Sequence, residues 1–295
     1  MALAQVAPLV SIIVPTHISR PPFLAEALAS VIAQDLTSWE VIVVDDGSPD
    51  PRALAELVGV DERIRVVRQE RGGIARARNR GLAHARGDLV AFLDYDDVWY
   101  PRHLSAAVEA LAARPGVVAA YTAFDVVTGY DKKFARTVRA AGPTTRHSVY
   151  SGGDRPSINT LVARRHAVAA VGGMDPAVEG ADDLDLVYKL AERGSFAYLD
   201  EVTSAYRLHD HNASRHTRRM ASALDRAIDA HLQRALDAGG TEAAADLTAL
   251  RNAAATARSG PAWRDWIGPC CPGALNLPAV STATPSLRTC WWTTH

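Results

Sequence analysis

Over the first half of the chain, short apolar runs alternate with stretches whose apolar residues recur at helical spacing. A short apolar run is typical of a buried strand, and apolar residues three and four positions apart are typical of an amphipathic helix. The runs predict strands at residues 10–14, 41–44, 64–67, 89–93 and 117–124, and the spacing predicts helices at 23–32, 51–58, 74–85 and 104–111. This order indicates βαβ units, so we expect an α/β fold with a Rossmann-like, mainly parallel sheet and helices on both faces.

The pattern changes between residues 125 and 156, where Gly142-Pro143 and Ser151-Gly152-Gly153 interrupt a charged stretch. Because such residues favour turns, we expect a long, mobile substrate loop there. Apolar patterns then return. They predict a strand at 158–163, a short helix ending at 171, an amphipathic helix carrying Leu184, Val187, Tyr188 and Leu190, a strand pair at 196–199 and 202–208, and two C-terminal helices between 218 and 257 that separate at Gly239-Gly240.

Composition narrows the class of protein. The 295 residues carry a net charge of −1 with a pI of about 6.8, and Arg and Asp are mixed along the chain, so no nucleic-acid partner is expected. No run of about 18 apolar residues and no secretory leader is evident, so we expect a cytoplasmic protein without a transmembrane segment. Contact with a membrane surface and the oligomeric state are left open.

The last 37 residues differ from the rest of the sequence. Residues 259–295 are rich in Pro, Thr, Cys and Trp and show neither helical nor strand periodicity, which predicts an irregular or disordered tail. All three cysteines, at positions 270, 271 and 290, lie in this tail. Their spacing lacks the paired pattern of a zinc site, and we expect no disulfide framework.

A cluster of carboxylates follows the fourth predicted strand, in the run Asp94-Tyr95-Asp96-Asp97. Like charges so close together repel one another unless a cation or hydrogen bonds compensate them. Oxygen ligands of this kind suit Mg²⁺ or Mn²⁺, so the run indicates a site for a metal and a diphosphate. The alternative is an acidic turn that precedes a helix opened by Pro101.

Polar loops follow the other strands as well. They are Pro15-Thr16-His17 after the first strand, Asp45-Asp46-Gly47-Ser48 after the second, and Gly72-Gly73 before the third helix. Open α/β sheets bind ligands at the carboxyl ends of their strands, so we expect these loops to share one crevice. Taken alone, the loop at 45–48 is better explained as a turn with a helix cap.

These motifs together resemble the inverting glycosyltransferases of family 2, which have the GT-A fold. The matching stretches are residues 10–16, 30–34, 40–48, 77–82 and 92–99, the last being Phe-Leu-Asp-Tyr-Asp-Asp-Val-Trp. The resemblance is close over residues 9–99 and looser over 159–214. It implies a donor-binding half at 1–100, an acceptor-binding and catalytic half at 101–216, and a C-terminal helical segment at 217–258.

The resemblance also assigns roles in binding a nucleoside diphosphate sugar. Contacts to the base and ribose would come from the first two strand ends, and contacts to the diphosphate and sugar from the third helix and the acidic run. The implied donor-binding residues are Pro15, Thr16, His17, Asp46, Arg78, Asp94 and Tyr95. A UDP or dTDP donor is favoured over GDP, because in the family a single Asp reads a pyrimidine N–H. For Arg78, a solvated helix face is the alternative.

The same resemblance implies a cofactor, Mn²⁺ or Mg²⁺, bound by Asp96, with Asp97 as a second candidate ligand. His209 falls where relatives carry a His that approaches the metal or the diphosphate. His211 and His216 compete with it for this role, and a surface histidine is the alternative.

An inverting transfer also needs a base that deprotonates the acceptor hydroxyl. The resemblance places it in Asp182-Asp183-Leu184-Asp185, where family members usually show Glu-Asp. Asp183 matches the presumed base, with Asp182 and Asp185 as alternatives. Acidic residues also simply favour a helix N-terminus, so a capping role is the competing interpretation.

The expected function is therefore transfer of a single sugar to an acceptor hydroxyl of a glycan, a lipid-linked intermediate or a secondary metabolite. No Gln-x-x-Arg-Trp motif of processive synthases occurs. Two alternatives remain. A sugar nucleotidyltransferase would show a Gly-rich loop after the first strand, which is missing, and a non-catalytic nucleotide-sugar-binding scaffold would have lost acidic residues that are present here.

Overall fold

The computed structural model describes residues 7–17, 21–129, 133–140, 144–152, 156–210, 212 and 217–258. The strands are β1 (Val10–Thr16), β2 (Trp39–Asp46), β3 (Ile64–Gln69), β4 (Leu89–Phe92), β5 (Val98–Trp99), β6 (Ala119–Thr128), β7 (Lys133–Val138), β8 (Leu161–Arg164) and β9 (Phe196–Leu208). The helices are α1 (Pro21–Ile32), α2 (Pro51–Val58), α3 (Ile74–His84), α4 (His103–Ala113), α5 (Arg146–Tyr150), α6 (Arg165–Ala170), α7 (Asp182–Ala191), α8 (Thr217–Asp237) and α9 (Thr241–Arg258), with 3₁₀ turns η1 (Ile158–Thr160) and η2 (Pro176–Val178).

The described strands form one nine-stranded sheet in the order β3-β2-β1-β4-β8-β6-β9-β5, with β7 paired to β6. Strands β3, β2, β1 and β4 are mutually parallel, as expected from the βαβ pattern. Beyond β4 the sheet is mixed, because β8 runs antiparallel to β4 and β6, whereas β9 runs parallel to β6. The predicted α/β class with a Rossmann-like parallel portion is confirmed.

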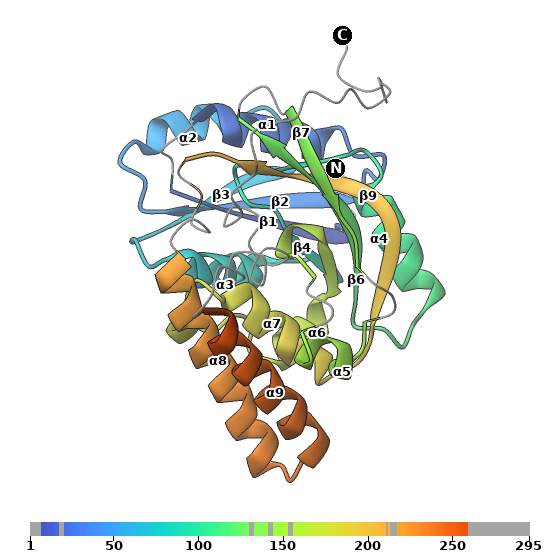
Figure 1. Cartoon of the computed structure of the whole chain (residues 1–295). Coiled ribbons are helices and arrows are strands. Elements are labelled where there is room, and N and C mark those ends of the chain that lie inside the picture. The colour runs from blue at the N-terminus through green and yellow to red at the C-terminus, as the bar shows by residue number, and fades with distance from the viewer. Residues whose placement is uncertain are drawn as a thin grey trace.

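Helices cover both faces of the sheet (Figure 1). The two faces follow from the alternation of side chains along β1. Ile12 belongs to a buried cluster with apolar residues of α1, α2 and α4, whereas Ile13 belongs to a second cluster with residues of α3, α6 and α7. A strand buried on both faces is mostly apolar, which explains the nearly continuous apolar runs of the sequence.

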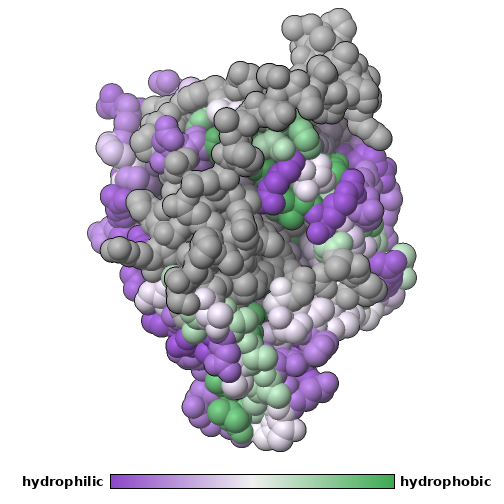
Figure 2. Space-filling model, viewed as in Figure 1, coloured by the Kyte–Doolittle hydropathy of each residue, from purple (hydrophilic) through white to green (hydrophobic). Residues whose placement is uncertain are grey.

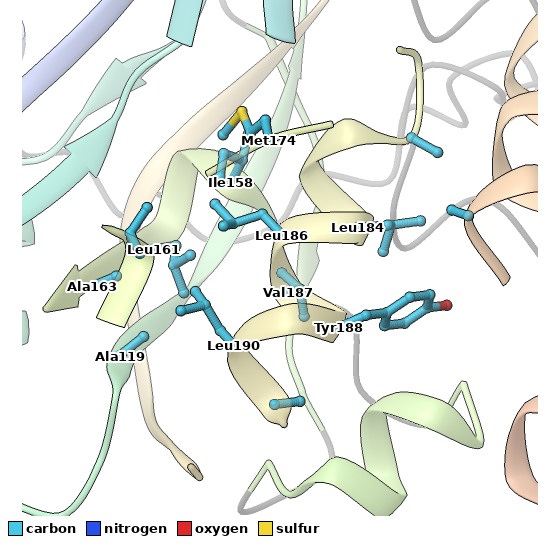
Figure 3. Close-up of a cluster of buried hydrophobic side chains, with 14 of the residues drawn as sticks. Ala119, Ile158, Leu161, Ala163, Met174, Leu184, Leu186, Val187, Tyr188 and Leu190 are labelled. Carbon is cyan, nitrogen blue, oxygen red and sulfur yellow. The ribbon is translucent and has the colours of Figure 1, made fainter. Parts of the chain in front are cut away.

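Helix α7 connects the sheet to the C-terminal helices. Figure 3 shows Leu186 and Leu190 directed toward Leu161 of β8, whereas Leu184 and Tyr188 point away from the sheet. The second direction leads to α8, which pairs with α9 and extends from the body of the molecule (Figure 1). The predicted break between these two helices at Gly239-Gly240 is confirmed.

The outer surface of the α8–α9 pair shows hydrophobic and hydrophilic residues interleaved (Figure 2). Among the described residues, no helix is both long enough and apolar enough to cross a membrane.

Three sequence predictions need correction. Residues 125–156 are not one long loop, because β6 continues to Thr128 and the described parts of the stretch include β7 and α5. The predicted strand pair at 196–199 and 202–208 is a single strand, β9, whose pairing with β6 shifts register around Ala123. The two-residue strand β5 was not predicted. The predicted irregular tail, with its three cysteines, lies outside the described residues.

Candidate functional site

The loops that follow β1, β2 and β4 lie at one edge of the parallel sheet, as their common direction requires. The side chains that join this edge to the second half of the chain belong to α3 and α7. Arg78 of α3 donates to Asp94 Oδ1 (2.6 Å), after β4, and to Asp182 Oδ2 (2.9 Å), at the start of α7. The predicted donor and catalytic segments are thereby brought into one cluster.

Asp46, at the end of β2, accepts hydrogen bonds from three donors. Its Oδ1 accepts from Gln69 Nε2 (2.8 Å) and from the backbone N–H of Gly72 (2.7 Å), and its Oδ2 accepts from the N–H of Gly73 (2.9 Å). Gly73 has a φ of 93°, a conformation that L side chains rarely adopt. Two carboxylate oxygens can accept about four hydrogen bonds, so Asp46 keeps capacity for one more donor.

Its neighbour Asp45 has a different role. Asp45 Oδ1 accepts from the N–H of Ser48 (2.8 Å), and Oδ2 pairs with Arg68 (2.5 Å). The turn-and-cap interpretation of this loop therefore describes Asp45, which is buried.

The end of β1 carries polar atoms that lack partners. Thr16 Oγ1 and His17 Nδ1 are buried, and within the described part of the chain neither has a hydrogen-bond partner. Pro15 pairs in register with Val44 of β2, next to these residues. Since buried polar groups are normally hydrogen-bonded, the two atoms suit a polar ligand beside β1.

Arg78 is a buried cation. Its side chain is 4% exposed, which excludes a solvated helix face. Burial alone would lower the pKa of Arg78, but the carboxylates of Asp94 and Asp182 outweigh this effect and raise it. The guanidinium is therefore permanently charged and fixed between two elements far apart in the sequence.

Asn159, at η1, holds the acidic run in place. Its Oδ1 accepts from the N–H of Asp94 (2.9 Å), and its Nδ2 donates to the carboxylates of Asp94 (3.3 Å) and Asp97. Trp99 Nε1 in turn donates to the Asn159 carbonyl (2.7 Å). No role was assigned to Asn159 from the sequence, because a polar residue shortly before β8 is the only local feature that marks it.

The remaining acidic residues of the run are placed differently from one another. Asp97 is buried and accepts from the backbone N–H of Arg207 (2.8 Å) as well as from Asn159. Burial raises the pKa of Asp97 well above its ordinary value, and the charges of Asp96 and Asp94 raise it further. Tyr95 is partly buried and packs against the cluster of β1 and α1.

Asp96 and His209 form a pair. Asp96 Oδ2 lies 2.9 Å from His209 Nε2, across a separation of 113 residues. Within the described residues, no three His, Cys, Asp or Glu side chains already form a metal-binding group. A carboxylate oxygen and an imidazole nitrogen nevertheless fit a divalent cation such as Mn²⁺. The competing candidates His211 and His216 lie outside the described residues.

Helix α1 supports His209. The centroids of the Phe23 and His209 rings lie 5.0 Å apart. The guanidinium of Arg207 lies over the Phe23 ring, 4.3 Å from its centroid. Arg207 also donates to Glu26 of α1 (2.6 Å). These three residues were not singled out from the sequence, because their partners lie about 180 residues apart.

The three acids of α7 point to different surroundings. Asp182 pairs with Arg78 and also accepts from the N–H of Gly180 (3.1 Å), whereas Asp185 binds Lys189 and His231 on the side of α8. Asp183 is half-buried and accepts from the N–H of Leu184 (2.8 Å). Burial and the charge of Asp182 raise the pKa of Asp183 to about 6, although Arg78 opposes the shift. Such a carboxylate can take up a proton near neutral pH.

Comparison with known proteins gives consistent matches. The family model described as "Glycosyl transferase family 2" matches residues 11–167. The chain is 36% identical over 192 residues to the O-antigen biosynthesis protein RfbC of Myxococcus xanthus, covering 64% of this chain and 15% of that protein. It is 47% identical over 107 residues to the succinoglycan biosynthesis protein ExoW of Rhizobium meliloti, covering 34% of this chain and 33% of that protein. The chain thus spans a third or less of the length of these two relatives.

A relative of similar size is the putative teichuronic acid biosynthesis glycosyltransferase TuaG of Bacillus subtilis. It is 29% identical over 212 residues, covering 70% of this chain and 82% of that protein.

Solved structures share the fold. S. aureus TarS residues 1–349 superimposes with a TM-score of 0.65 at 21% identity, covering 88% of this chain and 79% of that one. The mannosyltransferase PcManGT of Pyrobaculum calidifontis, solved in complex with GDP-Man and Mn²⁺, gives a TM-score of 0.59 at 25% identity, covering 88% and 78%.

Proposed function

The chain belongs to the family 2 glycosyltransferases and has the GT-A fold, and from this premise we propose that it is a metal-dependent inverting enzyme that moves one sugar from a nucleoside diphosphate to an acceptor hydroxyl. The observation that carries the proposal is the position of Arg78, whose guanidinium binds both Asp94 and Asp182. Through this contact, a donor-side segment and the half-buried Asp183 face the same cluster.

On the donor side, Asp46 would accept a hydrogen bond from the ring N–H of the base, using its remaining capacity. Thr16 Oγ1 and His17 Nδ1, which lack partners in the described residues, would bind the base or ribose beside Pro15. Arg78 would add a charge-assisted hydrogen bond to the diphosphate, and Asp94 and Tyr95 would face the ribose and sugar. UDP and dTDP are the favoured nucleotides.

For the metal, Asp96 and His209 are the proposed ligands, since they form the mixed carboxylate and imidazole pair. A bound Mn²⁺ or Mg²⁺ would neutralise charge that develops on the departing nucleoside diphosphate. Asp97 is buried and already accepts hydrogen bonds from Asn159 and Arg207, so we propose that it fixes the acidic run. The Mn²⁺ in the PcManGT complex supports a divalent cation in this fold.

On the acceptor side, Asp183 would take the proton of the attacking hydroxyl. Its raised pKa supports this role, and its neighbour Asp182 is already neutralised by Arg78. Asp185 is directed to α8 and is not proposed as the base. The names of RfbC, ExoW and TuaG, which refer to O-antigen, succinoglycan and teichuronic acid biosynthesis, favour a glycan as the acceptor class.

Titration calorimetry with UDP, dTDP and GDP, each with and without Mn²⁺, tests the proposal. We expect metal-dependent binding that favours one nucleotide and that Asp96→Ala abolishes. The matched control is Asp237→Ala, since Asp237 is an exposed aspartate at the far end of α8. Binding that needs no metal would refute the metal assignment, and no binding to any of the three nucleotides would refute the proposed donor site.

A further inference from the structure

His231 of α8 is completely buried and touches both ends of α7. Its Nε2 lies 3.0 Å from Asp185 Oδ1, in the first turn of α7, and its Nδ1 lies 3.1 Å from Glu192 Oε1, at the C-cap of the same helix. The Tyr188 ring lies between these two acids in the sequence and meets the imidazole edge-on at 5.1 Å. One side chain of α8 therefore contacts two acids that lie seven residues apart, at Asp185 and Glu192.

The two contacts of His231 stabilise the ionised form of both acids. An ionised carboxylate only accepts hydrogen bonds, so a ring nitrogen that carries a hydrogen donates to the acid it faces. Burial by itself raises the pKa of both Asp185 and Glu192, but the contacts with His231, together with Lys189 for Asp185 and Tyr150 for Glu192, outweigh burial and lower the pKa of both acids.

Other charged and titratable groups complete this cluster. Lys189 Nζ pairs with Asp185 (2.5 Å) and Arg234 approaches it at 3.8 Å, so Asp185 faces two cationic side chains besides the His231 ring. The hydroxyl of Tyr150, on α5, donates to Glu192 Oε1 (2.7 Å), the same oxygen that His231 approaches. His231 is the member of this set that contacts acids in the first turn and at the C-cap of α7.

Helix α7 is held from two directions. Asp182 in its first turn pairs with Arg78 on the donor side, and Asp185 in the same turn pairs with His231 on the side of α8. Asp183 lies between these anchors. The two ionic contacts on either side of Asp183 fix the backbone from which its carboxylate extends, and so limit the directions that the carboxylate can take.

We propose that His231 is a positioning residue for the transfer reaction: by bridging Asp185 and Glu192 it fixes α7, and with it the direction of the Asp183 carboxylate. The inference rests on the proposed function of Asp183. It gives the C-terminal helices a part in catalysis, although they contribute no group to the proposed donor site.

The test compares three variants. His231→Leu removes both contacts, and His231→Gln keeps an uncharged donor for one acid. The matched control is His147→Gln, because His147 is an exposed histidine of α5 that pairs with Asp246 of α9 (2.8 Å) and so probes the C-terminal helices without touching α7. Each variant is measured by amide hydrogen exchange over residues 182–191, by calorimetric binding of UDP with Mn²⁺, and by UDP released from UDP-GlcNAc and UDP-glucose.

We expect faster exchange in α7 for His231→Leu, unchanged UDP affinity, and a kcat lowered by about tenfold to a hundredfold per folded molecule, since small misplacements of a reacting group are costly. His231→Gln should fall between the wild type and His231→Leu, and His147→Gln should match the wild type. A purely structural residue would lower the melting temperature and leave kcat of the folded fraction unchanged.

Two results would overturn the proposal: unchanged exchange over α7 in His231→Leu, or faster exchange with a wild-type kcat. A different result identifies failure of the proposed function. If the wild type binds UDP but releases none from either donor, while exchange in His231→Leu still rises, then His231 secures α7 and the catalytic part of the inference falls with the transferase assignment.

Discussion

Adjacent residues of α7 differ in chemistry because their partners differ. Asp182 is bound by a buried guanidinium, whereas Asp183 accepts, within the described residues, from the N–H of Leu184. Burial then dominates for Asp183 and raises its pKa to about 6, while Arg78 limits the rise. One guanidinium thus pairs with Asp182 and leaves the proposed base, Asp183, with a raised pKa.

The pH dependence of turnover should report Asp183. A protonated carboxyl cannot accept a proton, so kcat should fall about tenfold per pH unit below a pKa of about 6 and level off above it. The raised pKa places this decrease in kcat near pH 6, whereas an ordinary Asp would place it near pH 4.

Asp183→Asn should lower kcat by about a hundredfold or more, as expected for loss of a general base, and should leave UDP affinity intact. Steady-state kinetics and calorimetry on the same preparation measure the two effects, with Asp237→Asn as the exposed control. A full rate in Asp183→Asn would move the base to another residue.

At the scale of elements, the distance of α3 from the sheet determines where Arg78 lies. A Cβ on Gly81 would fall 2.5 Å from Ile13 Cγ2 of β1 and 3.2 Å from Val44 Cγ2 of β2. Gly81 is three residues after Arg78 and so lies on the same face of the helix. The missing side chain lets α3 approach the sheet closely and directs Arg78 toward the ends of β1 and β4.

Gly81→Ala should therefore lower the free energy of unfolding by about 1–3 kcal/mol, because overpacking a close helix–sheet contact forces the elements apart. Urea unfolding measures this change. Gly116→Ala is the control, since a Cβ there would meet nothing within 4 Å. Equal stability of the two variants would show that α3 can shift without cost.

At the scale of the whole molecule, the parallel strands and the later mixed strands belong to one sheet, and Arg78 joins their functional segments. Asp94 follows β4, and Asp182 begins α7, which packs on β8 (Figure 3). The predicted donor and acceptor halves therefore share both a core and an ionic contact.

Arg78→Met should lower the free energy of unfolding by about 3–5 kcal/mol, since it leaves Asp94 and Asp182 without their buried cation. It should also weaken UDP binding. Arg80→Met, at an exposed position of the same helix, should do neither. Chemical denaturation and calorimetry distinguish the two variants, and comparable stability would mean that the buried pairs contribute little.

Much of the fold could be predicted from local patterns. Strands β1, β2 and β4 could be recognised as apolar runs because they are buried on both faces. Strand β7 was missed because its sequence Lys-Phe-Ala-Arg-Thr-Val is polar at half its positions and Phe134 is exposed. The continuity of β9 was missed because Asp200 and Glu201 resemble a turn, whereas pairing with β6 carries the strand through them.

The sequence by itself determined the family, the sheet with its helices, and the acidic and basic motifs, because each is written in consecutive residues. The tertiary structure decided which of these residues contact one another. The Arg78 contacts to Asp94 and Asp182, the pair of Asp96 with His209, and the hold of His231 on α7 join residues 16 to 113 positions apart. Burial and proximity set the charge and direction of these groups, and neither is encoded in the spacing of residues along the chain.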